Sequence, residues 1–487
     1  MRSKDHLFYL IKSLSKSEKR YFTLDAQKSG RKNSRYLALF HAINQQEVYS
    51  EIPLKKEFGR KLGDDKARLY EAILRAMRDY QSKKSYKTRI KELLTDAKIL
   101  FERKLYEQSQ NRLEEAKALA LELQDHLAVL EINLRQRQLI KEAPPKHYGE
   151  EVEKLILESK HHLKVLDYEL QLHDSYDRLG VDIRQYPVKL NEQQLAELQE
   201  KYGEVISQEA PTSSSFAARR RFFQIQAMYH RLSGDQQEMF EAFREVLNSW
   251  YGLDKNRQED FFVFMGDASN VLFATFQDAT QIEAFSKLLQ ELEELSPPSV
   301  HGQRFLFERI SIYRLLYLIN TRSSDIDEAV RKITEGLKQF DLNASAELSI
   351  MFNLIILLFL NGRYQECQTW LDKIIGSRKR YRDTRQDIQE GSRILKLIVT
   401  YQLDDYQKIE NTLRAIKRYF DQNKKSVFFS FHQELYKTMQ KLLSAIPGEE
   451  KKILTRFKEQ IKNGELKAPN GLDELTALWV DKLLEGY

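Results

Sequence analysis

Apolar residues return at helical spacing in five similar blocks along the chain. The blocks begin at Leu105, Gly234, Asp325, Gly362 and Asp404. In each block, a short turn leads to a residue that is aromatic, aliphatic or polar. A small or apolar residue follows three positions later. Two mostly apolar residues come next, the first four positions further on and the second three positions after that. This spacing places the side chains on one face of a helix. Because such a face needs a neighbour to cover it, the pattern predicts stacked helical hairpins.

The block at Gly362 shows the pattern most clearly. Its second helix carries four residues on one face: Tyr364, Cys367, Leu371 and Ile374. The preceding apolar segment, 350–360, is expected to be the first helix of the hairpin, with Gly362 at the turn. We therefore expect Cys367, the only cysteine in the chain, to be a small buried core residue.

These blocks resemble tetratricopeptide repeats. In the Gly362 block, Ile355 and Leu358 match the small and aromatic positions of the family's first helix, and the four residues above match its second helix. The corresponding residues of two other blocks are Ala97, Leu100, Tyr106, Ser109, Leu113 and Ala116, and Leu397, Tyr406, Ile409, Leu413 and Ile416. The family's first-helix Trp and closing Pro are absent, and the last three blocks are 37 and 42 residues apart instead of about 34.

The resemblance covers about residues 85–420 and implies an all-α, tetratricopeptide-like α-solenoid. Only 9 Pro and 18 Gly occur in 487 residues, and 31% of the chain is charged, a composition that also favours helices. We predict three parts: a basic helical module over 1–84, the repeats over 85–447 and a helical cap over 448–487.

Positive charge is concentrated in the amino-terminal module. Residues 1–90 hold 22 Lys and Arg against 10 Asp and Glu, a net charge of +12. The whole chain carries +6, so residues 91–487 carry −6. This asymmetry favours a separate partner for the module, although basic helical surfaces also serve simply to keep a protein in solution.

Part of this module has the outline of a helix-turn-helix. A short helix is expected over 52–58 and a longer one over 65–80, separated by a turn of about seven residues, longer than the usual three or four. Lysines and arginines lie where such a module would meet phosphates. The candidate contacts with RNA, DNA or another partner are Lys55, Lys56, Arg60, Lys61, Arg68 and Arg75.

The segment from Ser13 to Phe22, SLSKSEKRYF, resembles the start of a group of bacterial helical-repeat proteins found mostly among Bacteroidota. That resemblance implies a bacterial cytoplasmic protein and no particular activity. The absence of a secretory apolar segment and of paired cysteines also leads us to expect a cytoplasmic location without membrane insertion.

Two further basic clusters interrupt the repeats. They supply four candidate contacts for an acidic peptide or a phosphate chain in a solenoid groove: Arg219, Arg220, Arg378 and Arg380. The alternative interpretation is that the arginines of both clusters are simply exposed to solvent at the ends of helices.

Sequence motifs give little support for an enzyme. The chain contains no glycine-rich phosphate loop and no HExxH, and the adjacent His161 and His162 point about 100 degrees apart on a helix. We therefore expect no catalytic residue, metal or cofactor. The leading hypothesis is a non-enzymatic scaffold or adaptor that binds a protein or peptide, and the alternative is a nucleic-acid-associated regulator with the repeats as sensor. Oligomeric state stays open.

Overall fold

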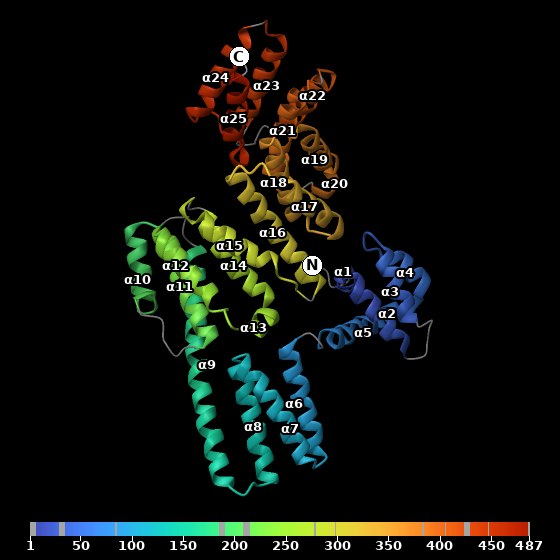
Figure 1. Ribbon diagram of the computed structural model, residues 1–487. Coiled ribbons are helices and arrows are strands. Elements are labelled where there is room, and N and C mark those ends of the chain that lie inside the picture. The colour runs from blue at the N-terminus through green and yellow to red at the C-terminus, as the bar shows by residue number, and fades with distance from the viewer. Residues whose placement is uncertain are drawn as a thin grey trace. The chain divides into compact units, whose positions relative to one another are not determined.

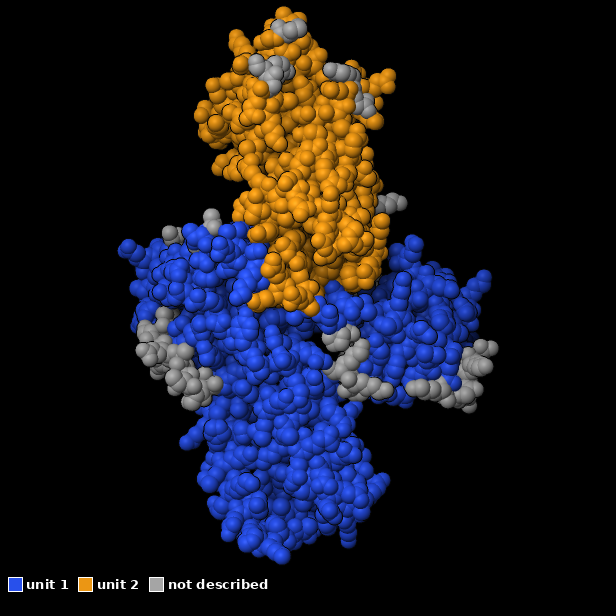
Figure 2. Space-filling view, in the orientation of Figure 1, with its two compact units in different colours: residues 1–288, 295–303 blue, residues 289–294, 304–487 orange. Residues whose placement is uncertain are grey.

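The computed structural model describes residues 6–28, 35–82, 85–184, 190–207, 215–276, 279–297, 299–381, 384–404, 406–422, 429–446 and 448–485. All regular structure in these ranges is helical and none is strand, which confirms the all-α prediction. The chain divides into two compact units (Figure 2). Unit 1 comprises residues 1–288 and 295–303, and unit 2 comprises residues 289–294 and 304–487. No helix in the described ranges has the length and apolar character needed to cross a bilayer.

Unit 1 is a succession of helices with short connections (Figure 1). They are α1 (His6–Ser13), α2 (Lys16–Lys28), α3 (Arg35–Gln45), α4 (Glu51–Phe58), α5 (Leu62–Ser82), α6 (Tyr86–Glu102), α7 (Tyr106–Glu122), α8 (His126–Glu142), α9 (Tyr148–Arg184), α10 (Glu192–Ser207), α11 (Phe216–Ser233), α12 (Gln236–Asn248), α13 (Asp254–Glu259) and α14 (Phe261–Phe276), with 3₁₀ turns η2 (Gly59–Lys61) and η3 (Ala279–Gln281).

The division between the units falls within α15 (Ile282–Glu293) and near the start of α16 (Val300–Asn320). The remaining helices belong to unit 2. They are α17 (Asp327–Gln339), α18 (Ala344–Leu360), α19 (Tyr364–Gly376), α20 (Arg378–Tyr381), α21 (Gln386–Gln402), α22 (Tyr406–Gln422), α23 (Phe429–Ser444), α24 (Glu449–Lys462) and α25 (Leu472–Glu485), with the 3₁₀ turn η4 (Pro469–Gly471) before α25.

Helices α1 to α5 enclose a hydrophobic core of their own. Phe22, Leu39 and Ile73 are almost fully buried in it. A capping box begins α2: the Ser15 amide donates to Glu18 Oε2 at 2.7 Å and the Glu18 amide donates to Ser15 Oγ at 3.2 Å. Burial of each large side chain contributes about 1.5–3 kcal/mol, so these packed helix faces stabilise the module.

The turn between α4 and α5 is shorter than the sequence suggested. α5 begins at Leu62 and not at Asp65, so only the three residues of η2 separate the two helices. Gly59 adopts a φ of 65°, which reverses the chain, and Leu62 is anchored in the core at 3% exposure. Asp64 and Asp65 then lie in the first helical turn, where carboxylates interact favourably with the helix dipole.

The remaining helices of unit 1 pack mainly against their neighbours in sequence. α7 packs against α6 and α8, α9 packs against α8 and α11, and α12 packs against α11 and α14. The register predicted for the first block is confirmed, because Ser109, Leu113 and Ala116 are all buried on α7. Hydrophobic residues at helical spacing thus specify which face of each helix is covered.

One packing contact in unit 1 joins distant segments. Glu259 at the end of α13 accepts from Ser85 Oγ at 2.8 Å and from the Tyr86 amide at 2.7 Å, which holds the start of α6. Asn256 donates to the Leu123 carbonyl at 2.8 Å, which holds the end of α7. These bonds fasten the α6–α7 hairpin to a helix more than a hundred residues further along the chain.

Unit 2 continues the hairpin pattern. α19 packs against α18 and α21, and each of α22, α23, α24 and α25 packs against the helix before it. Cys367 and Leu371 are fully buried, as the register predicted, and Gly362 makes the turn with a φ of 71°. α18 begins at Ala344, earlier than the predicted 350, because Asn343 Oδ1 caps it by accepting from the Ala346 amide at 2.9 Å.

Candidate functional site

Four of the six cations predicted on the helix-turn-helix outline lie on α4 and η2, the other two lie on α5, and all six are exposed. Lys55 forms an ion pair with Glu51 at 3.0 Å, and Lys66 also pairs with Glu51. Hydrogen bonds from Lys66 and then from Lys55 lower the pKa of the Glu51 carboxyl to about 2. Lys56, Arg60 and Lys61 are exposed beside this pair. The turn therefore presents a small cationic surface, here called the α4 turn surface, made of Lys55, Lys56, Arg60 and Lys61.

The exposed face of α5 has mixed charge. Arg68 and Arg75 are exposed as predicted, but they alternate along the helix with the exposed carboxylates of Asp64, Glu71 and Asp79. A polyanion lying along this face would meet carboxylates at every turn, which opposes binding. The α4 turn surface, rather than α5, is therefore the part of the module that suits phosphate contacts.

The three arginines at the start of α11 each reach a different neighbouring helix. Arg219 forms an ion pair with Glu245 of α12 at 2.9 Å. Arg220 forms an ion pair with Asp267 of α14 at 2.5 Å, and the Asp267 side chain is only 2% exposed. Arg221 stacks on Tyr176 of α9, with its guanidinium carbon 4.2 Å from the ring centroid.

Asp267 is the centre of this network. Its carboxylate also accepts from Gln224 Nε2 at 2.8 Å and from the indole nitrogen of Trp250 at 2.9 Å. A buried carboxylate with four donated hydrogen bonds is well satisfied. Arg219 and Arg220, predicted as groove contacts, are engaged in holding α11 to its neighbours.

The second predicted cluster lies in unit 2. Arg380 of α20 pairs with Glu347 at 2.7 Å and with Asp341 at 3.5 Å, and it donates to the Leu342 carbonyl at 3.1 Å. These contacts tie α20 to the start of α18. The side chain of Arg378 lies outside the described residues.

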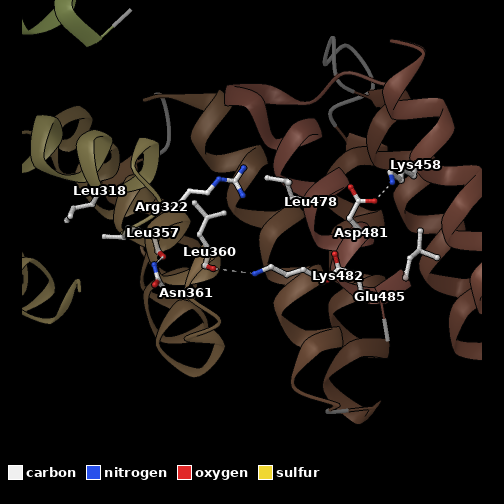
Figure 3. A pocket seen from close by; sticks show the side chains of 11 residues that line it. Leu318, Arg322, Leu357, Leu360, Asn361, Lys458, Leu478, Asp481, Lys482 and Glu485 are labelled. Carbon is white, nitrogen blue, oxygen red and sulfur yellow. Dashed lines mark hydrogen bonds and ion pairs between the residues drawn. The ribbon is translucent and has the colours of Figure 1, made fainter. Parts of the chain in front are cut away.

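A pocket of about 630 Å³ opens in unit 2 among α16, α18, α24 and α25 (Figure 3). Its lining is part apolar and part charged. It consists of Leu318, Arg322, Leu357, Leu360, Asn361, Lys458, Leu478, Asp481, Lys482, Leu484 and Glu485. Lys458 and Asp481 pair with each other, whereas the Arg322 guanidinium lies toward α25 in Figure 3. A half-apolar pocket with charged groups at its rim suits a peptide better than a fully apolar ligand.

The last helix, α25, forms one wall of this pocket and lies along the first helices of two hairpins. At its start, Leu472 lies against Gly391 of α21, where an added Cβ would be 2.8 Å from the leucine and 2.9 Å from Phe352 of α18. Near its end, the Trp479 ring meets Tyr401 of α21, with centroids 5.9 Å apart.

Lys482 completes the contact by donating to the Leu360 carbonyl at the end of α18, at 3.4 Å (Figure 3). The contacts of Leu472 and Trp479 advance along α25 in the same order as along α21, so these two helices run parallel. α25 also packs against α24 and carries the core residues Leu475 and Val480, so it covers parts of α18 and α21 as an amphipathic helix. We call this covered surface the α18–α21 face.

The sequence predicted a helical cap over 448–487 but did not predict the pocket. The pocket's residues come from four helices between Leu318 and Glu485, and no local pattern indicates that they meet. The only available signal was the apolar series Leu475, Leu478 and Trp479, which shows that this helix needs a surface to cover it.

No protein-family model matches this sequence. Searches of curated proteins and of solved structures likewise find no significant match.

Proposed function

We propose that this protein is a non-enzymatic, tetratricopeptide-like scaffold whose unit 2 binds an amphipathic helix of a protein partner. The observation that carries the proposal is the position of α25 on the α18–α21 face. A surface that already binds one amphipathic helix through apolar residues and a lysine has the chemistry by which proteins recognise amphipathic helices. The sequential pairing of helices in each unit and the recurring apolar register support the solenoid part of the proposal.

The pocket beside α25 is where the partner would enter. Leu360 and Leu478 offer a half-buried apolar wall, and Arg322 and Lys482 lie exposed at its edge. A partner helix with a large apolar residue followed by a carboxylate would contact both the apolar wall and the cations at its edge. Such a helix would either extend along α25 or displace it.

Affinity purification with matched variants tests this proposal. Leu478→Asp places a carboxylate in the apolar wall, and Ile446→Asp places one on an exposed residue that does not line the pocket. We expect a protein that the parent and Ile446→Asp both retain and that Leu478→Asp loses, with nuclease treatment making no difference. Thermal melts check that both variants fold. If folded Leu478→Asp retains the partner protein as well as the parent does, the proposal is wrong.

The second candidate function is nucleic-acid binding through the α4 turn surface. The observation that favours it is the three-residue connection between α4 and α5, which has the length of a helix-turn-helix turn and exposes Arg60 and Lys61. Binding of this kind falls with salt, with a log-log slope of roughly −0.9 for each phosphate neutralised on duplex DNA.

Charge reversal in the full chain separates the two functions. Reversing the four residues of the α4 turn surface to Glu should abolish salt-dependent binding to duplex DNA or RNA in an electrophoretic assay. The control reverses three exposed cations of α22, Arg414, Lys417 and Arg418, and should leave binding nearly unchanged. If the parent ignores both nucleic acids at about 50 mM salt, where phosphate contacts are strong, this second function is wrong.

A further inference from the structure

Helices α8 and α9 of unit 1 form a hairpin with exposed leucines on both helices (Figure 1). Leu127 and Leu134 of α8 are 65% and 62% exposed, and Leu163 and Leu170 of α9 are 58% and 55% exposed. The leucines of each pair are seven positions apart, so each pair lies on one face of its helix. Exposed apolar side chains that gather on one surface mark a site of interaction.

The two pairs of leucines lie on the same side of the hairpin. His126 faces His162, with their Nδ1 atoms 2.8 Å apart, and Asn133 Nδ2 donates to Ser159 Oγ at 3.3 Å. A later residue of α8 thus meets an earlier residue of α9, so the two helices are antiparallel. Each step along a helix turns the side chain by about 100° in the same right-handed sense. In antiparallel helices, the residues that follow a facing pair therefore turn to the same side, and here these are the leucines directly after the two histidines.

Along α9, this surface alternates between apolar and charged residues. The alternation covers five residues at steps of four and three positions, which keeps them near one face of the helix: Ile156, Lys160, Leu163, Asp167 and Leu170. The first is half-buried and the other four are exposed. Asp167 accepts a local hydrogen bond from Gln171 Nε2 at 2.9 Å. The two charges have opposite sign and lie on opposite sides of the central leucine, so a second copy reversed end to end would place lysine against aspartate.

The ends of the surface have the same complementarity. Lys141 lies seven positions after the second exposed leucine of α8, and Asp177 lies seven positions after the second exposed leucine of α9. Both are exposed, and because the helices are antiparallel they lie at opposite ends of the hairpin face. A face two helices wide, about 20 Å, and roughly 30 Å long covers on the order of 600 Å², close to the ~800 Å² that each partner contributes to a standard interface.

We propose that two copies of this chain associate through the α8–α9 face, antiparallel about a two-fold axis beside Leu163. In this arrangement Leu163 of each copy meets its counterpart, Ile156 meets Leu170, and Lys160 meets Asp167. Because the same surface serves both copies, the contact is isologous and closes as a dimer. The reversed order of the charges favours a second copy over an unrelated helix, since only a surface that pairs with itself needs two complementary halves.

Sedimentation velocity of the full-length protein over a range of concentrations tests the proposal, and the parent is expected to form a dimer. Leu163→Glu places two carboxylates together at the axis and should weaken association by roughly a hundredfold or more. Leu157→Glu is the matched control, since Leu157 is 64% exposed on the same helix but lies on another face, and it should associate like the parent. Circular dichroism melts compare the folding of the three proteins.

Exchanging the charges tests the register of the contact. Lys160→Asp brings a carboxylate against Asp167 of the other copy, and Asp167→Lys brings two ammonium groups together, so each should weaken association by roughly tenfold. The double variant Lys160→Asp/Asp167→Lys restores opposite charges across the axis and should regain most of the parent affinity. A purely local role of either residue predicts no such recovery.

Four results would overturn the proposal. They are a parent that stays monomeric at about 100 μM, where specific interfaces are well formed, association of Leu163→Glu equal to that of the parent, equal weakening by Leu163→Glu and Leu157→Glu, and a double charge variant as weak as the single ones. The proposal does not depend on helix binding in unit 2.

Discussion

The Nδ1 atoms of His126 and His162 lie 2.8 Å apart, so one imidazole donates to the other and at most one Nδ1 carries a proton. His126 begins α8, and His162 lies on α9. Glu169 Oε1 is 3.9 Å from His126 Nε2 and accepts from Ser215 Oγ at 2.5 Å. This buried polar contact links α8, α9 and the start of α11.

Acid should weaken this contact. Burial lowers the pKa of both histidines, and neighbouring imidazoles lower each further. A histidine with a folded pKa below the unfolded value of about 6.5 contributes stability above that value, and the contribution is lost as pH falls. Burial raises the pKa of the Glu169 carboxyl, and a raised carboxyl pKa increases the free energy of unfolding as pH falls, opposite to the effect of the histidines.

A double variant isolates the histidine contribution because it keeps Glu169. We expect the free energy of unfolding of the parent to fall more steeply between about pH 7 and pH 5 than that of His126→Gln/His162→Gln. Urea denaturation across this range measures both slopes. If the free energy of unfolding depends on pH equally in the parent and the double variant, the two histidines are not responsible for acid sensitivity.

Breaking the pair between Arg220 and Asp267 should be costly. Asp267→Asn leaves the largely buried guanidinium of Arg220 without its counter-charge, and loss of one partner of a buried pair costs about 3–5 kcal/mol. Glu245→Gln is the matched control, since it makes the same chemical change at the more exposed Arg219 pair and should cost at most about 1 kcal/mol. Urea denaturation followed by tryptophan fluorescence, to which Trp250 contributes, compares the two. Equal costs would contradict the structural role of Asp267.

Cys367 should be chemically silent in the folded protein. It is fully buried, its Sγ lies 3.5 Å from the Ile355 carbonyl, and burial raises the pKa of the thiol to about 12. A thiol-specific chromogenic reagent at pH 8 should react only after the protein unfolds.

Substitution of Cys367 tests the helix register further. Cys367→Ala should cost about 1 kcal/mol, whereas Cys367→Asp buries an unpaired charge and should cost more than about 4 kcal/mol. Thermal denaturation distinguishes the two, and an Asp variant that melts with the parent would show that the register of α19 is wrong.

Gly336 should not tolerate a side chain. A Cβ at this position of α17 would overlap the ring of Phe307. Gly336→Ala should therefore destabilise unit 2 by about 1–3 kcal/mol, even though alanine favours helix. Gly376→Ala has no atom within 4 Å of the new Cβ and should be neutral or slightly stabilising. Chemical denaturation of both variants checks the difference, and a neutral Gly336→Ala would mean that Phe307 can move aside.

Local sequence determined the helices, their buried faces and the exposed cations of the first module. The periodicity that predicted Cys367 and Leu371 in the core depends only on residues within one turn or two of each other, which is why it could be read directly. It placed Lys55 and Arg60 on the surface for the same reason. The exact helix starts at Leu62 and Ala344 depended on a turn glycine and an asparagine cap that the pattern alone did not resolve.

Tertiary structure decided which helices meet. Arg220 and Arg380 look like exposed cations in the sequence, but Asp267 and Glu347 engage them from other helices. The pocket beside α25 and the position of α25 likewise depend on side chains brought together from segments far apart in the chain. Helix periodicity specifies which face of a helix is apolar but not which neighbour covers it, because burial of apolar area is non-directional and many pairings would satisfy it.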